Sequence, residues 1–424
     1  MPESSTAPWE ILHAIRRRMS LARTIGLLLV AAPFSTAWAT EPSLLSEQEF
    51  LAELPVVLTA SRLAQPQTEA PAAVTVIDRQ MIAASGVRNL SEVFRLVPGF
   101  QVGFESGHRH VVGYHGLADE FSRRLQVLID GRSVYLPSFG GVSWSDLPIA
   151  LDDIERIEVI RGPNAVTYGA NSFLAIINIT TRHSAADRGG FVRATAGSND
   201  IRDGVLRMAG GDGDVSYRLT TGYQQDNGYG QRNDSRRITL MNGRMDVRPG
   251  VHDDIELQFG YNEGPRGRGE ADNPVNYPHD QEITSRFQQI RWRHRLASGD
   301  EVSVQFYYNH HESDEQILGL PIPLLGGFQI PVNFDVKSER YDAEVQHIVG
   351  LGESLRLAWG AGARLDLVEW PGFLGSAAPL DNHYYRLFAN LEWHVTPRLV
   401  LNAGAMAENS EITIGALDEE EITL

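Results

Sequence analysis

From residue 189 to about residue 407, apolar and polar residues alternate with a period of two, and this pattern constrains the fold more than any other feature. In residues 215–223 the odd positions carry Val, Tyr, Leu, Thr and Tyr, and the even positions carry Ser, Arg, Thr and Gly. The alternation recurs at residues 255–261, 302–308, 355–364 and 385–395. Successive side chains of a strand point to opposite faces, so each stretch predicts a β-strand with one apolar and one polar face.

The connections between these strands separate two fold classes that share the alternation. A soluble β-sandwich would show the same pattern. Here, however, short connections are expected to alternate strictly with long ones. The short ones lie at residues 211–214, 248–253, 297–300, 350–353 and 396–398, and the long ones at 226–235, 262–284, 312–336 and 368–382. Tight turns at one end and extended loops at the other are typical of an outer-membrane barrel, so we expect about eleven antiparallel transmembrane strands.

The composition is compatible with such a barrel and excludes several other classes. The 424 residues carry a formal charge of −17, which argues against a nucleic-acid partner. There is no cysteine, which excludes disulfides and thiolate metal sites. The mean hydropathy of −0.22 is too polar for a bundle of membrane helices, whereas a barrel exposes only alternate residues to lipid.

The first 39 residues have the pattern of a signal peptide. Three arginines at residues 16–18 precede a short apolar run at residues 25–32, and Ala37-Trp38-Ala39 provides the small residues of a cleavage site. A transmembrane anchor is the alternative, but it needs about 20 apolar residues. We therefore predict export, with cleavage after Ala39, and Met19 is an alternative start.

Residues 54–182 mix helical and strand patterns. Residues 89–97 place Leu90, Val93, Phe94 and Val97 on one helical face. An apolar run at 125–129 ends in Asp130-Gly131, the dipeptide of a tight hairpin turn. Further strands are expected at residues 154–160 and 175–180. This region predicts a compact domain with both helices and strands.

Three stretches of this region resemble the TonB-dependent outer-membrane receptors. They are LPVVLTASR at residues 54–62, VLIDGRSVY at 127–135 and IERIEVIRGPNAVTYGANSFLAIINITT at 154–181. The resemblance implies an α+β plug domain followed by an antiparallel transmembrane β-barrel. The expected organisation is a signal peptide (1–39), an N-terminal periplasmic segment (40–62), a plug (63–185) and a partial barrel (186–424).

The resemblance also assigns a TonB box to residues 54–60. These residues are Leu54, Pro55, Val56, Val57, Leu58, Thr59 and Ala60. A β-branched segment can add as a strand to the sheet edge of a partner, here the energy transducer TonB. The alternative is an ordinary first strand of the plug.

Three charged residues are implied to fix the plug to the barrel wall: Glu155, Glu158 and Arg161. The alternative is a solvated strand edge, where exposed ion pairs contribute only about 0–1 kcal/mol. Asp130 and Gly131 are expected to have only a structural role in their turn.

Histidines and oxygen ligands give weaker indications of a binding site. His108, His110 and His115 lie in an expected apex loop of the plug and are weak ligand-binding candidates, since isolated loop histidines are usually solvated. Oxygen ligands for calcium are offered by Asp226, Asn227, Asn233 and Asp234, but these residues lack the spacing of an EF-hand. The sequence therefore leaves open whether a calcium ion binds there. No cofactor is expected.

The resemblance implies an importer, not an enzyme. We expect a ferric siderophore or another large chelate such as cobalamin as ligand, with TonB and outer-membrane lipid as further partners. A surface sensor or adhesin on the same scaffold is the alternative. Family members close about 22 strands around a plug, so about eleven strands predict a truncated or frameshifted product, and a non-functional truncated copy is a further alternative.

Overall fold

The computed structural model describes residues 56–57, 62–67, 70–118, 121–163, 165–169, 171–229, 232–273, 276–319, 331–374, 378–396 and 398–414. The expected signal peptide and five residues of the expected TonB box, Leu54, Pro55, Leu58, Thr59 and Ala60, lie outside these residues. In the described part of the chain, no helix is both long and apolar enough to cross a bilayer.

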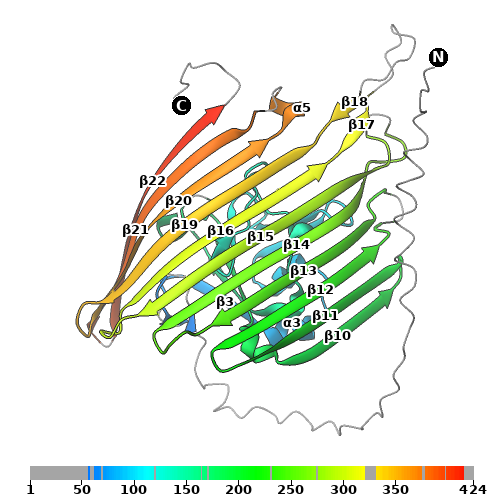
Figure 1. Ribbon diagram of the computed structural model, residues 1–424. Helices are drawn as coiled ribbons and strands as arrows, with labels where there is room; N and C mark the ends of the chain where they lie inside the picture. The colour runs from blue at the N-terminus through cyan, green and yellow to red at the C-terminus, as the bar shows by residue number, and fades with distance from the viewer. Residues whose placement is uncertain are drawn as a thin grey trace, which may run out of the picture. The chain divides into compact units, whose positions relative to one another are not determined.

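The second half of the chain forms one antiparallel sheet of 11 strands, here called the wall, in which each strand pairs with its neighbour in sequence (Figure 1). The wall strands are β10 (Gly189–Gly197), β11 (Ile201–Asp212), β12 (Val215–Asp226), β13 (Arg236–Val247), β14 (Asp253–Arg268), β15 (His279–Arg295), β16 (Glu301–Asp314), β19 (Val336–Gly350), β20 (Leu355–Glu369), β21 (Leu380–Thr396) and β22 (Leu399–Ile414). The expectation of about eleven strands is confirmed.

The two faces of the wall have the reverse polarity of a soluble sheet. In β12, Tyr217 is 52% exposed whereas Arg218 and Thr220, on the opposite face, are 3% and 0% exposed. Phe259, Trp359 and Leu387 are exposed in the same way on other strands. An exposed apolar face and a buried polar face are what a lipid-facing barrel wall requires, which confirms the expected fold class.

The connections differ from the expectation in three places. The first outer connection, residues 198–200, is short, so short and long connections do not alternate strictly. β14 ends only at Arg268 and β15 already begins at His279, so the loop expected at 262–284 is shorter than predicted. The connection after β16 contains a small hairpin of β17 (Gln316–Leu318) and β18 (Pro331–Asn333), and the one after β20 contains α5 (Pro371–Leu374).

The plug is a mixed sheet with short helices. Its elements are β1 (Val56–Val57), β2 (Gln65–Pro66), β3 (Ala73–Asp78), α3 (Arg79–Ser85), η1 (Leu90–Leu96), β4 (Phe100–Phe104), β5 (His110–Tyr114), β6 (Leu125–Ile129), β7 (Arg132–Ser133), η2 (Trp144–Asp146), η3 (Leu151–Asp153), β8 (Ile154–Arg161), α4 (Ala165–Tyr168), β9 (Ala175–Thr181) and η4 (Ser184–Asp187). The main sheet has the order β3-β8-β9-β6-β7, with β6 and β9 parallel. The helix expected at 89–97 is the 3₁₀ helix η1.

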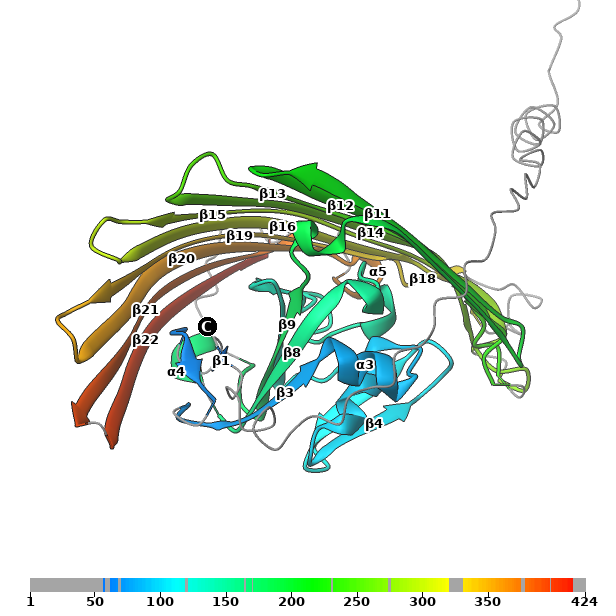
Figure 2. The ribbon, with the colours of Figure 1, turned by 90° about the horizontal axis from the view of Figure 1, so that it is seen from below.

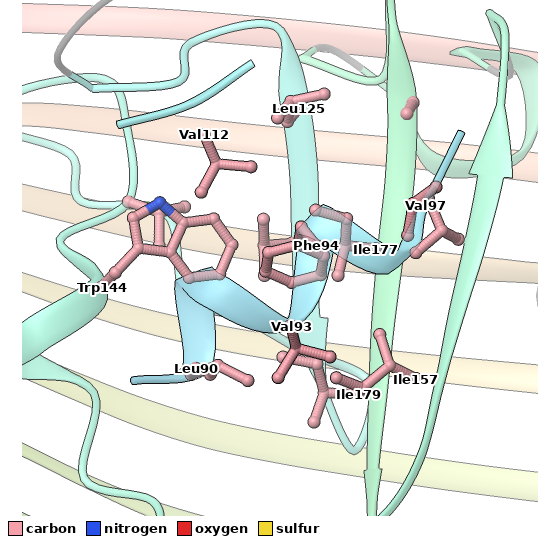
Figure 3. Close-up of a cluster of buried hydrophobic side chains, with 14 of the residues drawn as sticks. Leu90, Val93, Phe94, Val97, Val112, Leu125, Trp144, Ile157, Ile177 and Ile179 are labelled. Atoms are coloured by element: carbon pink, nitrogen blue, oxygen red, sulfur yellow. The ribbon is translucent and has the colours of Figure 1, made fainter. Parts of the chain in front are cut away.

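The plug core lies between η1 and the main sheet. Val93 and Phe94 of η1 are fully buried against Ile157 of β8 and Ile177 of β9, and the ring centroids of Phe94 and Trp144 are 5.0 Å apart (Figure 3). Figure 2 shows β8 and β9 on the concave side of the wall. The plug therefore has its own apolar core and meets the wall mainly through polar side chains.

Candidate functional site at the interface of plug and wall

Asp130 is the central plug residue of this interface. It forms the turn between β6 and β7 with Gly131, and both have positive φ angles, 49° and 83°, as expected for the dipeptide. Its buried carboxylate accepts hydrogen bonds from Thr181 Oγ1 (2.7 Å) and from Gln258 Nε2 of the wall (2.9 Å). The turn therefore joins the plug sheet to β14 of the wall.

Two wall arginines face the Asp130 carboxylate. Arg244 Nη1 lies 3.8 Å from its Oδ1, and Arg291 Nη1 donates to the Asp130 carbonyl over 3.3 Å. Burial alone would raise the pKa of Asp130. The charges of Arg244 and Arg291, together with the hydrogen bonds from Thr181, hold that pKa below its ordinary value. The carboxylate is therefore ionised and is bound on several sides.

Asp153, directly before β8, is a second buried anchor, at the same end of the plug sheet as Asp130. It is 0% exposed and accepts hydrogen bonds from Arg207 Nη1 (3.3 Å) and Thr220 Oγ1 (3.0 Å) of the wall. Arg218 Nε lies 3.6 Å away and its Nη1 contacts Asp187 of η4. Breaking a buried pair of this kind by removing one partner costs about 3–5 kcal/mol, so these contacts hold the plug firmly.

The outer end of the plug has two further anchors. Arg88 forms ion pairs with Asp203 and Asp226 of the wall. Asp146 accepts a hydrogen bond from Arg266 Nη2 over 3.2 Å and lies 3.5 Å from His311 Nε2. The plug is thus fixed to the wall at its outer end as well as near its middle.

The N-terminal part of the plug is tied to later wall strands. Arg62 donates to Glu344 of β19 over 2.6 Å, and its guanidinium lies 3.9 Å from the centre of the Phe388 ring. Gln65 contacts Glu392 of β21. Val57 of β1 pairs with Gln65 and is 1% exposed.

The two described residues of the expected TonB box, Val56 and Val57, therefore form a strand within the plug. Val57 packs in a small apolar cluster with Val74, Ile160 and Ile176. A segment held in this way has to leave the cluster before it can pair with another protein. The TonB box remains a prediction.

Two of the three residues expected to fix the plug to the wall, Glu155 and Glu158, form ion pairs with arginines of the plug. Glu155, with a side chain 50% exposed, pairs with Arg182 over 3.2 Å. Glu158 is fully buried and pairs with Arg156 over 2.8 Å, and Arg161 is half-buried at the end of β8. The ion pairs to the wall described above involve other residues. The sequence pattern does indicate the wall residues that form these pairs. They are charged residues on the polar face of a strand, and such residues need partners once that face is covered.

His108 and His110 differ from the expectation of solvated loop residues, whereas His115 is exposed. His108 and His110 are 5% and 4% exposed, and His110 Nδ1 lies 2.7 Å from Ser91 Oγ. His115 lies in a turn with a φ of 54°, with its ring against Tyr114. Burial, together with the charge of Arg266, lowers the pKa of His108 to about 3, and burial with Arg236 lowers that of His110 to about 3.

The stability of the plug is expected to fall as the pH drops below about 6.5. Unfolded histidines titrate near pH 6.5, whereas buried His108 and His110 resist protonation down to about pH 3. The unfolded state then binds more protons, and each histidine costs about 2 kcal/mol of stability by pH 5. The thermal unfolding midpoint of the plug, measured in detergent at pH 7 and pH 5, checks this.

A matched pair of variants assigns the pH effect to the buried ring. H108L removes a titrating group and is expected to reduce the loss between pH 7 and pH 5. H252L, at an exposed position, is expected to leave it unchanged. An equal pH dependence in both variants would contradict the assignment.

Two of the four possible calcium ligands, Asp226 and Asp234, are bound to protein groups. Asp226 pairs with Arg88 and, over 2.8 Å, with Arg236. Asp234 accepts hydrogen bonds from the backbone N–H groups of Gly107 (2.7 Å) and Tyr229 (2.8 Å). Within the described ranges, no group of three or more His, Cys, Asp or Glu side chains is arranged to hold a metal ion.

At the outer end of the interface, four aromatic rings form a continuous row, here called the aromatic row. Phe121 and Phe139 of the plug are stacked, with centroids 5.0 Å apart and planes 5° apart. Phe139 contacts Trp370, which precedes α5, at 5.5 Å, and Trp370 contacts Phe373 at 4.8 Å. Phe373 is 74% exposed. The row joins a plug loop to an outer connection of the wall, and sequence patterning did not indicate it.

Comparison with known protein families identifies the plug. Residues 66–176 match the TonB-dependent Receptor Plug Domain. Residues 66–176 therefore belong to the plug domain family of the TonB-dependent receptors. This confirms the resemblance carried by the stretches at 127–135 and 154–181, and places the wall in the outer membrane of a Gram-negative cell.

Individual relatives and solved structures agree with this family. The chain is 33% identical over 184 residues to a vitamin B12 transporter of Vibrio vulnificus (41% of this chain, 30% of the relative). It is 26% identical over 347 residues to that of Photobacterium profundum (76% and 52%). The outer-membrane ferripyoverdine receptor of Pseudomonas aeruginosa has the same fold, with a TM-score of 0.65 and 17% identity over 85% of this chain and 54% of the receptor. The match thus spans 30% to 54% of the length of these relatives.

Proposed function

We propose that this TonB-dependent receptor chain imports a large, scarce nutrient across the outer membrane, with a ferric siderophore as the first candidate ligand and cobalamin as the second. Related proteins carry these two kinds of ligand in their names, a ferripyoverdine receptor and two vitamin B12 transporters. TonB would supply the force, acting on residues 54–60. No step of this function changes a covalent bond of the ligand, so the proposal is a transporter and not an enzyme.

The aromatic row carries the proposal for ligand binding. It joins the plug, through Phe121 and Phe139, to the outer connection that holds Trp370 and Phe373. A ligand on this row touches both parts at once, so its binding can alter the plug. Aromatic side chains bind large ligands well because they offer much contact area at little cost in conformational entropy.

Uptake assays test the proposal. The protein is expressed at full length in a Gram-negative host without its own cobalamin and siderophore receptors, with and without TonB. Uptake of radiolabelled cyanocobalamin or ferripyoverdine that requires TonB is expected. Saturable binding without uptake would instead support the sensor or adhesin, and neither binding nor uptake of either probe would contradict the proposal.

Replacing Trp370 with alanine is expected to weaken ligand binding about tenfold, because the substitution breaks the row at its centre and removes about 1.4 kcal/mol of contact energy. Binding of the same probe to intact cells measures the effect. W359A is the matched control, since Trp359 is 49% exposed on the outward face of β20. An equal loss of affinity in both variants would show a general defect of the barrel.

A further inference from the structure

The outward face of the wall has a hollow near the outer ends of β13, β14 and β15, which lie side by side in Figure 1. This space, here called the outer hollow, has a volume of about 320 Å³. Its lining consists of Arg237 and Thr239 of β13, residues 263–265 of β14 and residues 282–284 of β15. All of these residues belong to the wall, so the outer hollow is separate from the interface with the plug.

The polar side chains of the outer hollow point away from the plug. Ile238 and Asn262 are each 1% exposed because their side chains lie on the plug side of the wall. Their neighbours in the sequence, Arg237, Thr239 and Glu263, are exposed. Successive side chains of a strand point to opposite faces, so these three side chains lie on the lipid-facing side.

The outer hollow coincides with a break in the pairing of β13 with β14. Pairing is present at Thr239 and again at Arg236, whereas the two residues between them, both within the described ranges, are not paired with β14. On β14, Pro265 has no N–H to donate. Gly264 has a φ of 132°, and a Cβ at this position would collide with the Arg237 carbonyl. The Gly-Pro dipeptide therefore fixes the place of the hollow in the sheet.

The outer hollow lies at the edge of the apolar band of the wall. Towards the inner end, outward positions of the same strands are apolar and exposed, as at Met245, Phe259 and Ile290. Trp292, near the inner end of β15, is eight residues from Thr284. Eight residues span about 27 Å along a strand, or about 20 Å of membrane height at a tilt of about 45°. Since the apolar band of a barrel is about 25 Å tall, the outer hollow lies at the level of the outer-leaflet headgroups.

The outer hollow combines one cation with several acceptors of hydrogen bonds. Arg237 is exposed and, among the described residues, makes no ion pair. Glu263 accepts a hydrogen bond from the Tyr261 hydroxyl over 2.7 Å, and Glu282 is exposed, with two threonines beside these carboxylates. A guanidinium binds phosphate through parallel N–H bonds, and carboxylates accept hydrogen bonds from hydroxyl groups. The lining therefore suits a headgroup that carries both phosphate and hydroxyl groups.

We propose that the outer hollow is a binding site for the phosphorylated saccharide headgroup of a glycolipid in the outer leaflet of the outer membrane. Arg237 binds a phosphate, and Glu263 and Glu282 bind hydroxyl groups of the sugar. The acyl chains continue along the exposed apolar side chains of β13 to β15. The site lies on the outside of the wall and takes no part in import, so this proposal and the importer function are tested separately.

The two carboxylates beside the arginine make the site selective. A lipid phosphate without hydroxyl groups meets Arg237 but also the negative charges of Glu263 and Glu282, which repel it. A glycolipid without phosphate leaves the arginine without a partner. Only a headgroup with both kinds of group satisfies the whole lining, so it is expected to bind most tightly.

Lipid binding to the purified protein tests the proposal. The protein is expressed at full length, purified in detergent with a chelator that removes divalent cations, and freed of bound lipid. The probes are a lipid A disaccharide with two phosphates, the same lipid A without phosphate, and dioleoyl phosphatidic acid. Native mass spectrometry measures their dissociation constants. The phosphorylated lipid A is expected to bind in a saturable way and about tenfold more tightly than either of the other lipids.

Three variants assign the binding to the outer hollow. R237Q removes the cation and is expected to weaken binding of the phosphorylated lipid A about tenfold. T239W fills the space but keeps the arginine, and it is expected to weaken binding to a similar extent. R202Q is the matched control, because it removes the same charge from an exposed arginine at the outer end of β11. Its affinity is expected to stay within about twofold of the unmodified protein.

Equal losses in R237Q and R202Q would show a general attraction of anionic lipid and would overturn the proposal. Unchanged affinity in R237Q or in T239W would overturn it as well, and so would phosphatidic acid that binds as tightly as the phosphorylated lipid A. These outcomes do not depend on uptake of any nutrient, because binding is measured in detergent.

Discussion

Replacing Asp130 with asparagine is expected to destabilise the docking of the plug by about 1–3 kcal/mol, because the change removes a buried carboxylate to which Thr181 and Gln258 donate, while Arg244 and Arg291 keep Asp246 and Glu256 as counter-charges. Arg244 and Arg291 face the Asp130 carboxylate, and the side chain of Asp130 is almost completely buried. An asparagine amide also presents a donor where Gln258 Nε2 now donates. Faster hydrogen exchange in β6, β7 and β9, with β10 to β12 unchanged, is the expected result.

E155Q is the matched control for D130N. Glu155 also ends in a carboxylate and also pairs with an arginine, but its side chain is 50% exposed, so the loss should stay below about 1 kcal/mol. If both variants show the same exchange rates as the unmodified protein, Asp130 does not anchor the plug. If E155Q has the larger effect, Glu155 is the better anchor, as the family resemblance implies.

Asp130 also shows how far the sequence allows prediction. The Asp-Gly dipeptide predicts the turn between β6 and β7, because a tight hairpin turn requires positive φ angles, and both residues have them. The bonds of this turn to the wall could not be predicted, because their donors Gln258 and Gln289 lie 128 and 159 residues further along the chain. Local rules determine the turn, and the packing of two domains determines its role.

The wall shows the same division between local and long-range information. The alternation in residues 215–223 predicts which side chains face outward, since the period of a strand is fixed at two. The outer ends of β14 and β15 could not be predicted in this way. Beyond Glu263 the residues include Gly264, Pro265 and charged side chains, which resemble a loop, yet the two strands stay paired as far as Arg268 and His279.

The burial of His108 and His110 could not be predicted from the sequence. His108 and His110 are polar residues in a segment expected to be a loop, where solvent exposure is the usual outcome. His110 contacts Ser91 of η1, and Gly107, next to His108, donates to Asp234 of the connection after β12, so the burial of the two histidines involves both the plug and the wall. A polar residue buried by tertiary packing cannot be distinguished from an exposed one by its neighbours in the sequence.

Replacing Val57 with proline is expected to abolish TonB-dependent uptake while ligand binding at the outer face is retained. Proline lacks the backbone N–H and has a fixed φ, so it removes one donor from any strand that this segment adds to a partner sheet. The aromatic row lies on other segments of the plug and wall, which leaves binding unaffected. Uptake and surface binding of cyanocobalamin and ferripyoverdine are measured side by side.

V57T separates pairing with TonB from packing within the plug. Threonine has nearly the shape of valine and keeps the N–H, but places a hydroxyl in the apolar cluster of Val74, Ile160 and Ile176, at a cost of about 1–3 kcal/mol. Because binding to TonB competes with burial of Val57, this variant is expected to keep its uptake and to bind a purified periplasmic fragment of TonB more tightly, by about tenfold for each 1.4 kcal/mol.

Normal uptake by V57P would exclude residues 54–60 as the TonB box. Loss of uptake in V57T as well would mean that Val57 acts through the plug core, with the site of the pulling force elsewhere in the N-terminal segment.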